Sequence, residues 1–340
     1  MSVLISIVIP LYRSGRTIGE VLKSLEAMDF SKERVELLLI YYPTNDDTLK
    51  VVQEFIERNR GVFHDIRVIP RGDRRANVAR NLGVKLSRGR YIMLLNDDIV
   101  LPPNALRNAI EIFNADPLVG AVTFPYVLQP PRVNELAMFF RYFGRVSEVK
   151  VLALGCSIVR RDVFDKVGFI NEELGPPMTS NDDYEFSARI ARAGFKVVID
   201  GKAIARDVGS LKSVKADSTA AKSRRSKVFK LLRLLLNYLR YDFTLGADTY
   251  YEVLRSAPNT WRLEAVLYLL IPLPLPVLLA VWPQGVLPYL LILFVAIVVY
   301  FRCVKPVYVA YATLLVLRRV SRVYGFVFRM LYRALRAVGW

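Results

Sequence analysis

The stretch Arg88-Gly-Arg-Tyr-Ile-Met-Leu-Leu-Asn-Asp-Asp-Ile99 decides the fold that the sequence predicts. Its short apolar run, residues 91–95, ends abruptly at Asn96, Asp97 and Asp98. Such a run between helical segments is typical of a strand buried on both faces of a parallel sheet. Ligands bind beyond the carboxyl ends of these strands, where acidic side chains can hold a divalent cation and, through it, a diphosphate. The other interpretation is a turn that only solvates the strand end, because Asn and Asp are common turn residues.

Strand and helix patterns alternate on the N-terminal side of this stretch. Strands are predicted over 5–10, 35–41 and 66–69, and helices over 17–28, 48–58 and 76–86. Strands that alternate with helices imply parallel βαβ units and a doubly wound α/β domain. No GxGxxG motif follows the first strand, which argues against a dinucleotide-dependent oxidoreductase.

The pattern continues after residue 98. The sequence predicts a helix to about residue 114, strands over 119–126 and 151–159, and helices over 161–167 and 184–193. The loop over 174–183 contains glycine and two prolines. It is interpreted as a lid over the site, or else as an ordinary surface turn.

Positive charge is concentrated in the C-terminal part of the chain. Residues 1–210 contain 29 Lys and Arg against 26 Asp and Glu, whereas residues 211–340 contain 19 against 5, so the net charge of +17 divides into +3 and +14. This basic part is also very apolar, which favours anionic membrane lipids as its partner. Nucleic-acid binding is a minor alternative, because a basic patch alone says little about its partner, and no nucleic acid is predicted as a partner.

Two apolar runs, 261–282 and 286–301, are the candidate membrane spans. Each is near the lower limit of about 17–25 residues that cross a bilayer. Pro272, Pro274 and Pro276 lie in the first run, and each removes a helical hydrogen bond, so a broken helix or a re-entrant hairpin is the alternative there. We interpret the pair as a two-span hairpin with cytoplasmic basic flanks. A third span over 304–317 would place the basic tail outside, against the same rule.

The spacing of basic and apolar residues over 222–240 predicts an amphipathic helix in the membrane interface. The alternative is a helix packed on the soluble domain with a solvated basic face. The domains expected are the α/β domain over 1–215, an interfacial helix and linker over 216–260, a transmembrane hairpin over 261–317 and a basic interfacial tail over 318–340.

Cysteine usage and the N-terminus indicate the compartment. Cys156 and Cys303 lie far apart and predict neither a disulfide nor a zinc site, consistent with a reducing environment. Residues 1–10 show no basic start and no cleavage site, so no signal peptide is predicted. We expect the protein at the cell membrane, with the α/β domain on the cytoplasmic face.

Five motifs within residues 3–210 resemble, in their order, those of the family 2 glycosyltransferases. They are the opening strand at 5–12, Arg80-Asn-Leu-Gly83, the acidic-ended strand at 91–98, residues 155–161 with 167–171, and residues 182–189 with 193–194. Each motif is weak alone, but five in order are specific. The resemblance implies a GT-A fold, a Rossmann-like α/β domain that binds a nucleotide-diphospho-sugar.

The resemblance also implies a metal site. Asp98, with Asp97 as a lesser candidate, would hold Mn²⁺ or Mg²⁺, which neutralises the departing diphosphate as a Lewis acid. Asn96 is a weaker ligand than the aspartate common in the family, and it would hydrogen-bond the ribose or the sugar. Asp183 would be the general base for the acceptor hydroxyl, or else a simple helix cap favoured by the helix dipole.

Pro10, Tyr12 and Arg80 would lie near the nucleotide by the same resemblance. Their alternatives are, in that order, a strand stop, a core side chain and a charge on a helix surface. His64, the only histidine, precedes a strand and is interpreted as a surface or turn residue.

Two departures from the family pattern affect specificity. Tyr41, Tyr42 and Pro43 stand where the family commonly has an acidic pair, which leaves the nucleobase open. Arg206-Asp207 stands where some members have a histidine that contacts the metal.

These features predict a metal-dependent inverting glycosyltransferase. It would move a hexose, mannose or glucose, from a GDP- or UDP-linked donor to a lipid-linked or membrane-associated acceptor, such as polyprenyl phosphate, a glycolipid or a lipid-linked oligosaccharide. A processive polysaccharide synthase is less favoured, because no QxxRW follows Asp183 and two spans would hardly form a channel. The alternative is a catalytically silent GT-A domain that binds a nucleotide or scaffolds a membrane complex.

Overall fold

The computed structural model describes residues 2–128, 142–174 and 182–209. They belong to the first of the two units into which the chain divides, Met1–Thr219. The predicted interfacial helix (222–240), both candidate spans and the basic tail lie outside the described residues, as does residue 303. Among the residues that the structure describes, no helix is both long and apolar enough to cross a membrane.

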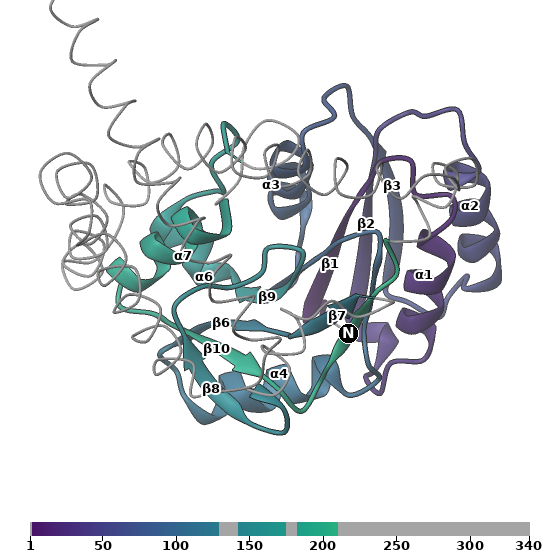
Figure 1. Ribbon diagram of the computed structural model, residues 1–340. Coiled ribbons are helices and arrows are strands. Elements are labelled where there is room, and N and C mark those ends of the chain that lie inside the picture. The colour runs from purple at the N-terminus through teal and green to yellow at the C-terminus, as the bar shows by residue number, and fades with distance from the viewer. Residues whose placement is uncertain (1, 129–141, 175–181, 210–340) are drawn as a thin grey trace, which may run out of the picture. The chain divides into compact units, whose positions relative to one another are not determined.

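An eight-stranded mixed sheet forms the centre of the domain (Figure 1). Its strands are, in spatial order, β3 (Asp65–Pro70), β2 (Val35–Tyr41), β1 (Ile5–Leu11), β4 (Tyr91–Leu95), β9 (Cys156–Arg160), β6 (Val119–Thr123), β10 (Lys196–Asp200) and β8 (Val146–Val149). The first four are mutually parallel, β9 is antiparallel to both of its neighbours, and β10 is parallel to β6. The carboxyl ends of β1 to β4 therefore meet at one edge of the sheet.

Helices cover both faces of this sheet. One layer contains α1 (Ile18–Glu26), α2 (Thr48–Arg58) and α4 (Ala105–Ala115), and the other contains α3 (Ala76–Leu86), α6 (Arg161–Val167) and α7 (Asp182–Arg192). Figure 1 shows α1 and α2 on the opposite side of β1 from α6 and α7. Successive side chains of a strand point to opposite faces, so Ile7 packs in the core under α1 whereas Val8 packs in the core under α3. A short 3-10 helix, Lys32–Arg34, precedes β2.

Glycine allows α3 to lie close to β1. A Cβ on Gly83 would lie 2.9 Å from Cγ2 of Val8 and closer still to Cγ1, nearer than real side chains approach. Gly83 therefore sets the separation between helix and strand, and with it the position of Arg80 one turn earlier on α3.

A second, three-stranded sheet lies beside the end of β4. It consists of β5 (Ile99–Val100), β11 (Ala205–Asp207) and β7 (Tyr126–Leu128), with Asp207 opposite Ile99 and Ala205 opposite Tyr126. Residues from three distant parts of the chain thus meet next to Asp98.

The predicted α/β domain is confirmed, with differences in its second half. The single strand predicted over 119–126 is two strands in different sheets, because Pro125 between them has no N–H to continue a ladder. The strand predicted over 151–159 begins only at Cys156, and it runs antiparallel. β1 continues through Pro10 to Leu11, so the proline does not end the strand.

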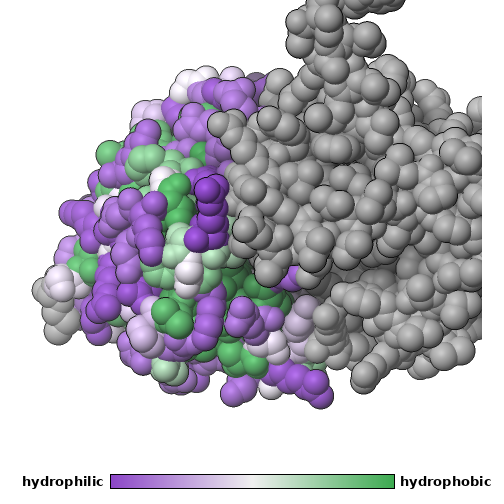
Figure 2. Space-filling view, turned by 90° about the vertical axis from the view of Figure 1, so that its left-hand side faces the viewer, coloured by the Kyte–Doolittle hydropathy of each residue, from purple (hydrophilic) through white to green (hydrophobic). Residues whose placement is uncertain are grey.

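Surface hydrophobic residues are scattered on the described domain. Figure 2 shows a mainly hydrophilic face on which single hydrophobic residues are interspersed. The large exposed ones include Leu118, Phe143 and Phe169. Scattered surface residues of this kind need no special explanation.

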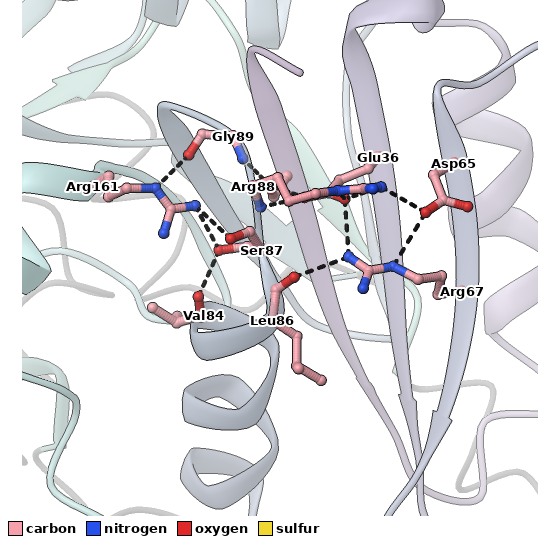
Figure 3. A network of polar contacts seen from close by, with 10 residues as sticks. Glu36, Asp65, Arg67, Val84, Leu86, Ser87, Arg88, Gly89 and Arg161 are labelled. Carbon is pink, nitrogen blue, oxygen red and sulfur yellow. Dashed lines mark hydrogen bonds and ion pairs between the residues drawn. The ribbon is translucent and has the colours of Figure 1, made fainter. Parts of the chain in front are cut away.

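A buried carboxylate fixes the entrance to β4 at the amino end of the parallel strands (Figure 3). Glu36 on β2 has no exposed surface and accepts hydrogen bonds from Ser6 (2.6 Å), from the backbone N–H of Arg88 (2.6 Å) and from the guanidinium of Arg67 (3.0 Å). Burial raises the pKa of Glu36, but the hydrogen bonds from Ser6 and Arg88 outweigh it and hold the pKa below its ordinary value. This network joins β1, β2 and β3 to the turn that leads into β4.

Candidate active site

The candidate site lies where β1, β2, β3 and β4 end side by side. Tyr12, Tyr42, Arg71 and Asn96 each follow the last residue of one of these strands. Because parallel strands end at one edge, these four residues surround a common region. That edge is where the sequence predicted the nucleotide site.

Asn96 is held on two sides. Its N–H donates to the carbonyl of Gly155 (2.8 Å), and its Oδ1 accepts from Nη2 of Arg80 (2.8 Å). A Cβ on Gly155 would overlap the Asn96 amide, so only glycine fits beside it. The proposed contact of Asn96 with ribose or sugar stays a prediction.

Asp97 is almost completely buried, with 9 % of its surface exposed. The hydroxyl of Ser14, itself fully buried, donates a hydrogen bond to Oδ2 of Asp97. The same hydroxyl accepts from the N–H of Tyr12 (3.0 Å). The turn after β1 therefore fixes the orientation of the Asp97 carboxylate. This turn also contains Arg13, with φ +53°, a left-handed backbone that is uncommon for a residue other than glycine.

Asp98 and Asp207 converge on one point. A Cβ on Gly209 would lie 2.9 Å from Oδ2 of Asp98 and 2.8 Å from Oδ1 of Asp207. The carbonyl of Asp98 accepts from the N–H of Val208 (2.8 Å), which holds the two segments together. Asp207 was noted in the sequence only as part of a departure from the family pattern. Its place in the sequence, where some family members have a metal-contacting histidine, was the signal that could have identified it.

Two carboxylates at one point suit a hard divalent cation, since Mg²⁺ is commonly bound by one or two carboxylates together with substrate phosphates. The described part of the chain contains no group of three or more His, Cys, Asp or Glu side chains placed to hold a metal. The described residues would thus supply only part of the ligand set of a cation at Asp98; diphosphate oxygens and water are the ligands that commonly complete such a set.

Tyr126 is a site residue that the sequence did not indicate. Burial, and after it the neighbouring Cys156, Asp207, Asp183 and Asp98, raise its pKa to about 12. Its phenol is therefore protonated at neutral pH, and it stands among the carboxylates of both halves of the site. A tyrosine at a strand end has many structural roles, so no sequence signal distinguished it.

Arg80 connects the end of β4 with the start of α7. Its guanidinium donates to Oδ1 of Asn77 (2.6 Å) and to Oδ1 of Asn96 (2.8 Å), and it forms an ion pair with Asp182 (3.6 Å). Only 5 % of its surface is exposed, so it is not the surface charge that was the alternative. Its predicted proximity to the nucleotide stays a prediction.

Asp183 lies in the first turn of α7, which begins one residue earlier, at Asp182. Burial, and after it the charge of Asp182, raise the pKa of Asp183 to about 6. The N–H of Tyr184 donates to its Oδ1 (3.1 Å). A carboxylate with a pKa near neutrality is suited to accept a proton from a hydroxyl group.

Aromatic and basic side chains form a ladder along the ends of β1, β2 and β3. Cζ of Arg13 lies 5.5 Å from the centre of the Tyr12 ring. The rings of Tyr12 and Tyr42 meet edge to face, with their centres 5.6 Å apart. Cζ of Arg71 lies 5.8 Å from the centre of the Tyr42 ring. Tyr12 also lines a cavity of about 530 Å³ together with Asp46 and their neighbours. Tyr42, one of the departures from the family pattern, thus takes part in this ladder. Pro10 is buried inside β1.

The other predicted residue, His64, lies just before β3. Its Nδ1 is 3.2 Å from the carbonyl of Glu33, in an exposed contact. The structure places it in the connection between α2 and β3, away from the carboxyl edge of the sheet.

Comparison with known proteins bears on this geometry. Residues 6–168 match the family model described as Glycosyl transferase family 2. This region, slightly less than half of the chain, is therefore similar to a family 2 glycosyltransferase domain. The predicted enzyme class, a glycosyltransferase, is confirmed at the level of this domain.

The sequence is also similar to curated proteins. It is 31% identical over 153 residues to the poly-beta-1,6-N-acetyl-D-glucosamine synthase of Staphylococcus aureus, a match that covers 45% of this chain and 34% of the relative. The synthase of the same name from Staphylococcus epidermidis is 31% identical over 119 residues, 35% of this chain and 27% of the relative. The chain therefore matches only about a third of the length of these relatives.

Solved structures share the fold. A mannosyltransferase, PcManGT from Pyrobaculum calidifontis, in complex with GDP-Man and Mn²⁺, is 19% identical with a TM-score of 0.61, and the match covers 94% of this chain and 86% of that one. S. aureus TarS is 17% identical with a TM-score of 0.51, over 76% of this chain and 50% of that one. The fold implied by the resemblance, a GT-A domain of Rossmann-like α/β type, is confirmed.

Proposed function

We propose that the protein is a metal-dependent, inverting glycosyltransferase that uses a nucleotide-diphospho-sugar. The observation that carries the proposal is the pairing of two carboxylate centres at one sheet edge. Asp98 and Asp207 converge at one centre, and Asp183, with its raised pKa, lies at the other. Arg80 contacts groups on both sides.

Each centre fits one half of the reaction. Asp98 and Asp207, with Asp97 beside them, would hold a divalent cation, which when bound supplies charge neutralisation for the departing diphosphate. Asp183 takes the proton of the acceptor hydroxyl as its oxygen attacks the anomeric carbon. The new C–O bond forms on the face opposite the diphosphate, and the electron pair of the breaking bond leaves with the phosphate oxygen. The configuration at the anomeric carbon is thereby inverted.

We further propose a hexose donor, mannose or glucose carried by GDP or UDP, and a lipid-linked or membrane-associated acceptor. The support for the nucleotide is a solved structure of the same fold that holds GDP-Man and Mn²⁺. The support for the acceptor is the apolar, basic C-terminal sequence, which would place the site near anionic lipid head groups. Relatives named as N-acetylglucosamine polymer synthases make UDP-GlcNAc a necessary member of any donor panel.

The test is the release of nucleoside diphosphate from GDP-mannose, UDP-glucose and UDP-GlcNAc, with Mn²⁺ or Mg²⁺ and a membrane lipid extract. We expect turnover with one donor, loss of it in Asp98→Ala and in Asp183→Asn, and retention in Asp165→Asn, an exposed aspartate of α6. A chelator should abolish turnover, and added Mn²⁺ should restore it. Turnover that survives both site variants would contradict the assignment.

The second candidate is a catalytically silent domain that binds a nucleotide as a membrane scaffold. The specific observation in its favour is that Asn96 is engaged by Arg80 and Gly155 at a position where the family commonly has a metal-binding acid. It predicts nucleotide binding by calorimetry without turnover on any donor.

A further inference from the structure

One face of α3 joins the two halves of the candidate site. Asn77 and Arg80 lie three residues apart and therefore on the same side of the helix. Asn77 is fully buried, and its Nδ2 donates to the carbonyl of Leu174 (2.7 Å) and to Oδ2 of Asp182 (3.1 Å). Its Oδ1 accepts from Arg80, whose other nitrogen reaches Asn96.

We propose that Arg80 is a positioning residue for the aspartates that open α7, and that Asn96 is the neutral acceptor that leaves the charge of Arg80 to those aspartates. The proposal rests on the proposed function, in which Asp183 is the base. It adds a role for Asn96 that does not depend on contact with ribose or sugar.

The charges around Arg80 support this role. Burial lowers the pKa of its guanidinium, and the charges of Asp182, Asp183, Asp97 and Asp98 oppose that effect. Its Nε is buried without a hydrogen-bond partner among the described residues. The positive charge of Arg80 thus interacts with several carboxylates. A carboxylate at 96 would take a large share of its charge, whereas an amide oxygen accepts a hydrogen bond without adding a negative charge.

Arg80 is a source of positive charge near Asp183. Asp182 is its neighbour on α7, Arg80 faces it from α3 and lowers its pKa, and Tyr126 approaches it from β7. From α6, the hydrophobic ring of Phe164 stacks on α7 against Phe186. Removal of charge from Arg80 should therefore raise the pKa of Asp183.

Asn96→Asp is the decisive variant, because it keeps the shape of the side chain and adds one negative charge beside Nη2 of Arg80. In the full chain, at saturating Mn²⁺, we expect the acid limb of the kcat/KM profile to move to higher pH by about one unit. At pH 6 the variant should thus be about fivefold slower relative to its own plateau than the wild type, and about tenfold slower at pH 5 and below. Arg80→Lys, which keeps the charge but cannot reach both sides, should lower kcat more than it raises KM for the donor.

Asn81→Ala is the matched control. Asn81 lies on the same helix, and its Nδ2 donates to the carbonyl of Ile170 (2.7 Å) and to Oε1 of Glu172 (2.9 Å). Among the described contacts it has no hydrogen bond to Asp182 or Asn96. We expect a lower melting temperature in this variant and an unchanged acid limb. If Arg80 and Asn96 had a purely structural role, Asn96→Asp would likewise lower the melting temperature and leave the acid limb unchanged.

A readout without substrate separates failure of this inference from failure of the proposed function. The free energy of unfolding depends on pH, and the part of this dependence that disappears in Asp183→Asn reports the titration of Asp183 itself. We expect this titration near pH 6 in the wild type and at higher pH in an Asn96→Asp background. An unshifted transition would overturn the inference even in an active enzyme, while a shifted transition in a protein that turns over no donor would refute only the proposed function.

Discussion

Asp183 combines burial with a neighbouring carboxylate, and both raise its pKa, to about 6. A base acts in its ionised form, so kcat/KM should be level above about pH 7 and fall about tenfold per unit below pH 6. Asp183→Asn should lower kcat by at least about 100-fold. Steady-state rates between pH 5 and 9 measure both effects, with Asp165→Asn as the control. A flat profile through pH 6 would contradict a catalytic role.

The sequence predicted the site residues unevenly. Asn96, Asp97 and Asp98 could be found because a buried strand ends in consecutive polar residues. Arg80 and Asp183 could be found only through the family resemblance, since a lone Arg or Asp on a helix has no distinctive pattern. Tyr126 and Ser14 could not be found, because their positions depend on the packing of β7 and of the turn after β1.

At the scale of elements, α3 packs on β1 through Gly83, and the atoms that exclude a larger residue all belong to Val8. Gly83→Ala should lower the free energy of unfolding by about 1–3 kcal/mol, as overpacking does. Chemical denaturation measures this change. In a Val8→Ala background the added loss should be smaller, because the two positions are in contact.

Gly19→Ala is the control for that substitution. Gly19 also lies in a helix, but its Cβ would meet only Cγ1 of Val51, at an ordinary 3.6 Å. The change should stabilise the protein by about 0.4–1 kcal/mol. Equal destabilisation at both glycines would refute the packing argument.

A second prediction at the scale of elements concerns the hydrogen-bond network around Glu36. Glu36→Gln should destabilise the protein by about 1–3 kcal/mol at pH 7, because buried donors lose a charged acceptor. A carboxyl whose pKa is lowered on folding stabilises the fold above its unfolded pKa of about 4.3, and this stabilisation is lost as the pH falls through the lower, folded pKa. The difference between variant and wild type should therefore shrink below about pH 4.

Thermal melts of both proteins across this pH range provide the measurement. Glu20→Gln, which removes an exposed ion pair with Lys23, should change stability little at any pH. A constant difference for Glu36→Gln from pH 3 to 7 would exclude the electrostatic explanation.

The first four strands and three helices could be predicted from the sequence because their apolar periodicity is local. The second half could not, because β9 enters the sheet antiparallel between β4 and β6. β5, β7 and β11 are two or three residues long, too short to show a period. Their pairing depends on tertiary contacts rather than on sequence pattern.

At the scale of the whole molecule, the charge asymmetry predicts that membrane attachment belongs to the C-terminal part. Deletion of residues 261–340 should move most of the protein from the membrane pellet to the supernatant, because the two long apolar runs are removed. Fractionation followed by immunoblotting measures this. Continued attachment in the pellet, resistant to high salt, would instead favour the amphipathic segment at 222–240.

The single amide of Asn77 has a further consequence. It holds both Leu174 and Asp182, so the described residues on either side of 175–181 are fixed at one point. The entropy needed to close a loop rises only slowly with its length. We therefore expect that a longer or shorter sequence between Leu174 and Asp182 would leave the donor edge and the base in their places.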